Sequence, residues 1–191
     1  MSARRSPSSV SPAGLTPGVG FKSGPLPLSG ALAEDGLKVD SFDEGHCIGR
    51  YGMVVICVWR MLPTLRKLDA VRRATGEALV EYPGGIGSIG VTEQGTPLMG
   101  AAEREAASKL FSDFRQTTRF AAMAIEGDGF WSSSSRSMVT AISLLARVPF
   151  PMRSFRYVSD ATAWQARFPG TPSPYALADA VERCRAKIGP R

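Results

Sequence analysis

The strongest constraint on the fold is a short apolar run, MVVICVWR, at residues 53–60. It is apolar on both faces of an extended chain and includes several β-branched residues. Alternate side chains of a strand point to opposite faces, so a run of this kind is typical of a sheet covered on both sides. The run therefore predicts a strand buried between two layers.

Strand-like and helix-like segments alternate along the rest of the chain. Strands are predicted at residues 46–52, 53–60, 86–91, 120–127 and 154–158. Helices are predicted at residues 63–82, 103–114 and 132–147, then after 159 and from 173 onward. The order is β-β-α-β-α-β-α-β-α plus an extra C-terminal helix. It indicates an α/β fold with a mixed sheet, in which an antiparallel pair precedes parallel, right-handed crossovers.

The two ends of the chain differ from this pattern. Pro, Gly and Ser make up 17 of the first 30 residues, a composition too poor in large apolar side chains to offset ordering entropy. We therefore predict a disordered tail at residues 1–38, a domain at 39–170 and a C-terminal helix at 171–191. The tail is either a solvated extension or a regulatory segment.

Charge and cysteine content limit the classes of partner. The net charge is +6, of which Arg4, Arg5 and Lys22 contribute +3. The remaining positive charge is spread over a whole domain. The basic residues at 66, 67, 72 and 73 surround a predicted helix and do not line one face of it. The sequence therefore predicts no nucleic-acid surface. No run is long enough to span a membrane, and no secretory signal is expected. Three widely spaced cysteines are typical of a reducing cytoplasm.

The chain contains no recognisable catalytic, metal-binding or phosphate-binding motif. Its one histidine, His46, could belong to a catalytic triad only with partners that the sequence cannot place. Adjacent strand residues point to opposite faces, so His46 and Cys47 are a poor pair of metal ligands. We therefore expect no metal, no cofactor and no enzyme activity.

The loop GTPLMGAAERE, at residues 95–105, lies between a predicted strand and a predicted helix. With the order of elements, its PLMGAAE segment resembles STAS domains, which include the anti-sigma factor antagonists, and a looser bacterial group described as SEC14-like. Gly100 stands where the antagonists have Asp, and Ala101 and Ala102 stand where they have two serines. Ala102 takes the place of the phosphorylated serine and cannot carry phosphate. Glu103 places a carboxylate in the first helical turn, which the helix dipole favours.

A second loop, EGDGFWSSSSRS at residues 126–137, leaves the fourth predicted strand. Its serines and Arg136 could hold an anion at a helix N-terminus, and Phe130 and Trp131 could form an apolar wall. Alternatively, the serines cap the helix, or they are phosphorylated for regulation.

The resemblance implies a non-catalytic module that regulates by binding a protein partner. The alternative is a SEC14-like carrier or sensor of a small molecule or lipid, with a pocket near Trp131. Both loops follow parallel strands, so they are expected at one edge of the sheet. The predicted binding surface consists of Leu98, Met99, Glu103, Trp131, Ser132 and Arg136.

Overall fold

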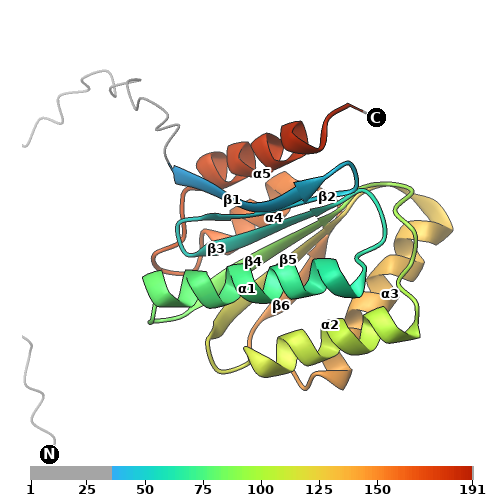
Figure 1. The fold of residues 1–191 in the computed structure, drawn as a ribbon, viewed down its shortest axis with the longest axis horizontal. Coiled ribbons are helices and arrows are strands. Elements are labelled where there is room, and N and C mark those ends of the chain that lie inside the picture. Colours follow the sequence, from blue (N-terminus) through green and yellow to red (C-terminus); the bar gives the residue numbers. More distant parts are fainter. Residues whose placement is uncertain (1–35, 191) are drawn as a thin grey trace, which may run out of the picture. The chain divides into compact units, whose positions relative to one another are not determined.

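The computed structural model describes residues 36–190, apart from the side chains of Phe130 and Trp131 (Figure 1). The predicted tail therefore falls mostly outside the described residues. Its last two residues, Leu37 and Lys38, belong instead to the first strand of the sheet.

The described residues form one mixed sheet of six strands, with five helices. The strands are β1 (Leu37–Asp43), β2 (His46–Tyr51), β3 (Val54–Trp59), β4 (Ile86–Thr92), β5 (Thr118–Ile125) and β6 (Met152–Phe155). The helices are α1 (Leu65–Glu81), α2 (Ala101–Asp113), α3 (Gly129–Leu145), α4 (Val158–Gln165) and α5 (Pro174–Ile188). This architecture confirms the predicted α/β class.

The strands lie in the sheet in their order along the chain, from β1 to β6. The β1–β2 and β2–β3 pairs are antiparallel, and the pairs from β3 to β6 are parallel. Right-handed crossovers that always step in one direction put their helices on one face. Accordingly, α1, α2 and α3 cover one face, and α4 and α5 pack against the other (Figure 1).

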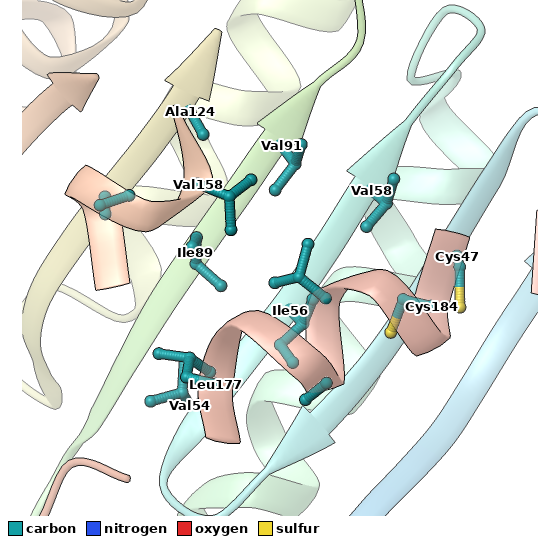
Figure 2. Packing of buried hydrophobic residues seen from close by; sticks show 14 of the residues in the cluster. Cys47, Val54, Ile56, Val58, Ile89, Val91, Ala124, Val158, Leu177 and Cys184 are labelled. Carbon is teal, nitrogen blue, oxygen red and sulfur yellow. The ribbon is translucent and has the colours of Figure 1, made fainter. Parts of the chain in front are cut away.

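Strand β3 is buried on both faces, as its apolar run predicts. Val54, Ile56 and Val58 belong to the core beneath α4 and α5, as Figure 2 shows for the α5 face. The intervening Val55 and Cys57 belong to the core beneath α1. Residues 53–59 are therefore all apolar because neither face of the strand meets solvent.

The C-terminal helix α5 also follows its sequence signals. The Ser173 hydroxyl accepts a hydrogen bond from the Ala176 N–H, and Pro174 occupies the first turn. Four residues of its predicted apolar stripe are buried: Leu177, Val181, Cys184 and Ile188. Because α5 packs on β1, β2 and β3, it is part of the same compact unit as the sheet.

The prediction omits one strand and misplaces the bounds of several elements; strand β6, for example, spans Met152–Phe155 rather than residues 154–158. Strand β1 was not predicted because it lies at a sheet edge and its LKVDSFD sequence contains several polar residues. Its positions are half-buried or exposed, so it lacks the apolar run that marks a buried strand. Helix α3 begins at Gly129 rather than at Ser132, and the φ of 76° at Gly129 favours glycine there. Helix α4 begins at Val158, with Tyr157 rather than Ser159 at its N-cap.

Candidate ligand-binding cavity

An apolar cavity of about 140 Å³ lies between the sheet and the α1–α3 layer. The strands contribute a floor, α2 and α3 contribute walls, and the loop between β4 and α2 contributes the rim. Most of the lining residues are apolar or small, and the polar ones are the serines and threonines at 75, 88, 92, 96, 118 and 135. The apolar or small ones include Trp59, Leu68, Val71, Ile89, Gly90, Ala107, Leu110, Phe111, Phe114, Met123, Met138, Val139 and Ile142. No charged residue belongs to the lining among the described residues.

Two small residues line the cavity, one on α2 and one on the sheet. Ala107 is buried where α2 faces the sheet, and it reaches only a short distance from the helix. On the floor, a Cβ atom at Gly90 would lie 2.7 Å from the sulfur of Met123. Gly90 therefore allows the Met123 side chain to lie across the neighbouring strand.

The rim of the cavity is held in place from beneath. The Thr96 hydroxyl is within hydrogen-bonding distance of two main-chain oxygens, that of Glu93 at 2.7 Å and that of Trp59 at 3.0 Å. Pro97, Leu98 and Met99 follow directly and line the cavity. Leu98 is 45% exposed, so this short loop separates the cavity from solvent.

A charged cluster fixes the same edge of the sheet. Arg60, Glu93 and Glu126 are the residues that directly follow β3, β4 and β5. Glu93 is buried and accepts hydrogen bonds from Arg60 at 2.9 Å and from Arg185 of α5 at 3.3 Å. Arg185 also donates to Glu126 at 3.0 Å. These ion pairs link the strand ends to α5, and sequence reasoning missed them because each residue resembles an ordinary loop charge.

The two predicted loops are neighbours, as their places after β4 and β5 predict. A Cβ atom at Gly127 would lie 2.8 Å from Cγ of Gln94, so the loops touch. Leu98 is exposed, Glu103 is half-buried in the first turn of α2, and Met99 packs against the cluster around Leu68. These residues therefore lie near one sheet edge, although Met99 is turned toward the core.

The serine segment does not have the predicted geometry. Because α3 begins at Gly129, its N-cap is Asp128, and the serines lie inside the helix. Ser132 is fully buried, donates to the Gly129 carbonyl at 3.1 Å and accepts from Arg136 at 3.2 Å. The serines therefore do not cap the helix. The free N–H groups of the first turn lie before Ser132, so Ser132 is not surrounded by the anion-binding groups that were predicted. The side chain of Trp131, to which the predicted pocket was assigned, is outside the described residues.

The other residues singled out in the sequence are Ala102, the basic residues of α1, and the His46–Cys47 pair. Ala102 is exposed in the first turn of α2. Of the basic residues on α1, Lys67 pairs with Asp43 at 3.4 Å, and Arg72 pairs with Asp113. His46 and Cys47 point to opposite faces of the sheet, as predicted, since His46 stacks on Trp59 and Cys47 joins the core beneath α5.

Comparisons with known proteins found no match to any family, curated protein or solved structure. Within residues 36–190, no helix combines the length and the apolar character needed to cross a membrane. The same residues contain no group of three or more His, Cys, Asp or Glu side chains placed to hold a metal ion.

Proposed function

We propose that this protein binds a small, neutral, apolar molecule in the cavity between the sheet and helices α1–α3. The observation that carries the proposal is a cavity of about 140 Å³ with no charged residue among its described lining residues. Folded cores contain few voids larger than a water molecule.

The energetic cost of the void supports a binding role. A cavity costs about 24 cal/mol of stability for each Å³, so this one costs about 3 kcal/mol. That is a large share of the ~5–15 kcal/mol by which a domain is stable. A ligand that fills the space would recover part of this cost.

The lining indicates the class of ligand. Without a charged residue among the described lining residues, the cavity offers no partner to an ionised group, whose burial is costly. Met99, Met123, Met138 and Met152 all line it, and methionine adapts to ligands of different shapes. Apolar cavities of about 150 Å³ stay dry and bind benzene. A single-ring aromatic compound or a short aliphatic chain therefore suits the volume.

A thermal-shift titration with toluene and indole tests the proposal. A ligand that binds only the folded state at 100 times its Kd raises the unfolding free energy by about 2.7 kcal/mol. Ala107→Leu should abolish the shift by filling the cavity. Ala102→Leu makes the same change at an exposed position of the same helix, and it should leave the shift intact. Absence of a shift in the wild-type protein, or equal shifts in both variants, would contradict the proposal.

This function is a form of the SEC14-like carrier or sensor that the sequence suggested. Met138, Val139 and Ile142 place the cavity along the middle of α3, beyond the predicted position near Trp131. The order of the parallel strands supports the proposed STAS-like architecture.

A second candidate function is binding of a protein partner at the sheet edge, without a phosphoswitch. The exposure of Leu98 beside the loop after β5 favours it. Leu98→Asp should then prevent capture of partners that the wild-type protein retains, while Leu144→Asp, at an exposed leucine of α3, should not. Equal capture by both variants would place the partner surface elsewhere.

A further inference from the structure

The β1–β2 hairpin contains a chain of three hydrogen-bonded side chains. Oδ1 of Asp43 lies 2.7 Å from Nδ1 of His46, and Nε2 of the same ring lies 3.0 Å from the hydroxyl oxygen of Ser41. Both ring nitrogens of His46 are therefore engaged, one by a carboxylate and one by a hydroxyl. This is the sequence of contacts by which a serine becomes a nucleophile in hydrolases.

The fold holds the three groups in register. Ser41 and Asp43 are two residues apart on β1, which places their side chains on one face of the strand. Asp43 is paired directly with His46 on β2. The imidazole is stacked on Trp59 of β3 with ring centres 5.9 Å apart, so its orientation is fixed. The shift in register between Val39 and Ser41 adjusts the position of Ser41 on the edge strand.

The protonation states are the ones that nucleophile activation requires. Burial raises the pKa of Asp43, but the hydrogen bonds from His46 and the Gly45 N–H more than compensate and lower it to about 2. An ionised carboxylate can only accept, so Nδ1 of His46 carries the proton. Burial, with the charges of Lys67 and Arg66, lowers the pKa of His46 below 6.5 despite Asp43. At neutral pH, Nε2 is therefore free to accept the proton of Ser41.

We propose that Ser41 is a nucleophile toward carboxylic esters, with His46 as its general base and Asp43 as the residue that positions the imidazole. The hydroxyl oxygen of Ser41 bonds to the ester carbonyl carbon as its proton passes to Nε2. The resulting imidazolium gives that proton to the departing alcohol, and the acyl group remains on Ser41. Water then repeats both transfers, releasing the carboxylic acid and restoring Ser41.

The site is accessible from the edge of the sheet. Strand β1 is an edge strand, with β2 as its sole strand neighbour among residues 36–190. Such an edge presents main-chain N–H groups without a strand partner, and main-chain N–H groups are one kind of donor that stabilises an acyl oxyanion. Ser41 is half-buried, and the Asp43 side chain is 47% exposed. Met61 is 50% exposed next to the hairpin and provides an apolar contact for the ester.

Labelling with a fluorophosphonate probe, followed by peptide mapping, tests the assignment on the full chain. A stable adduct is expected on Ser41 and on no peptide of the Ser41→Ala protein. Asp43→Asn and His46→Gln should lower the labelling rate constant at least about 100-fold. The matched control is Ser133→Ala, at an exposed serine in α3, which should label like the wild type.

The pH dependence separates an activated serine from one whose hydrogen bonds are only structural. Labelling of the wild type should rise with pH through a single pKa below 6.5 and then become constant, as His46 loses its proton. This measurement needs no variant, so it remains decisive if His46→Gln fails to fold. Absence of an adduct on Ser41, a rate that keeps rising tenfold per pH unit above 7, or an unchanged rate in folded Asp43→Asn would each overturn the proposal.

Discussion

Replacing Ala107 by Leu should stabilise the protein, which is unusual for enlarging a buried side chain. Ala107 is 6% exposed and faces the cavity from α2. Leucine adds three carbon atoms, each worth about 0.8 kcal/mol on burial. Ordering the larger side chain costs about 0.5–1 kcal/mol. The net gain is therefore about 1.5 kcal/mol, which is within the ~3 kcal/mol that the void costs.

Chemical and thermal unfolding measure this gain directly. A change of about 1.5 kcal/mol should raise Tm by about 3–6 °C for a domain of this size. The contrasting variant is Ala180→Leu, at a fully buried alanine of α5 in the tightly packed core on the other face. Overpacking there should cost about 1–3 kcal/mol. The reasoning is refuted if Ala107→Leu destabilises the protein as much as Ala180→Leu does.

Three further predictions concern charges and the helix start. Glu93→Gln should cost about 1–3 kcal/mol in urea unfolding, because it removes the buried carboxylate that pairs with Arg60, while Arg185 keeps its ion pair with Glu126. The comparison is Asp128→Asn, which removes an exposed ion pair with Arg156 and should cost less than about 1 kcal/mol. Ala102→Ser should change the melting temperature little, and a loss above about 2 kcal/mol would show that this exposed position is tightly packed. The folded-state pKa of Asp43 is about 2 against an ordinary 3.8, so its stabilisation is present above pH 3.8 and is lost as pH falls toward 2. Asp43→Asn should reduce the slope of stability against pH in that window, as measured by unfolding at each pH.

Local signals account for the parts of the fold that the sequence predicts well. Strand β3 needs only its own apolar run, and α5 needs only Ser173, Pro174 and its buried stripe. Strand β1 was missed because an edge strand can be polar on exposed positions, so its identity depends on pairing with β2. The predicted start of helix α3, at residue 132, is three residues too late. Gly129 and two aromatic residues precede the serines, and they carry no strong helix-start signal.

The candidate sites depend on contacts between elements, which single-sequence reasoning cannot supply. The cavity is a space left between α2, α3 and the sheet, and no individual residue encodes it. The sequence did identify Leu98 and Met99 as loop residues of interest, and both line the rim. It also identified His46 but could not provide its partners. Those partners, Ser41 and Asp43, both lie in β1, which the sequence did not predict.

A crystal structure of the protein soaked in bromobenzene shows whether the cavity holds an aromatic ligand, because bromine is located by its anomalous scattering. We expect an anomalous peak between Phe111, Met123 and Val139, with the sheet and α2 in unchanged positions. In the Ala107→Leu protein, the added side chain should occupy the space and the peak should be absent. A wild-type crystal with no anomalous density between the sheet and α2, or with side chains closed over the void, would contradict the claim that this cavity binds an apolar ligand.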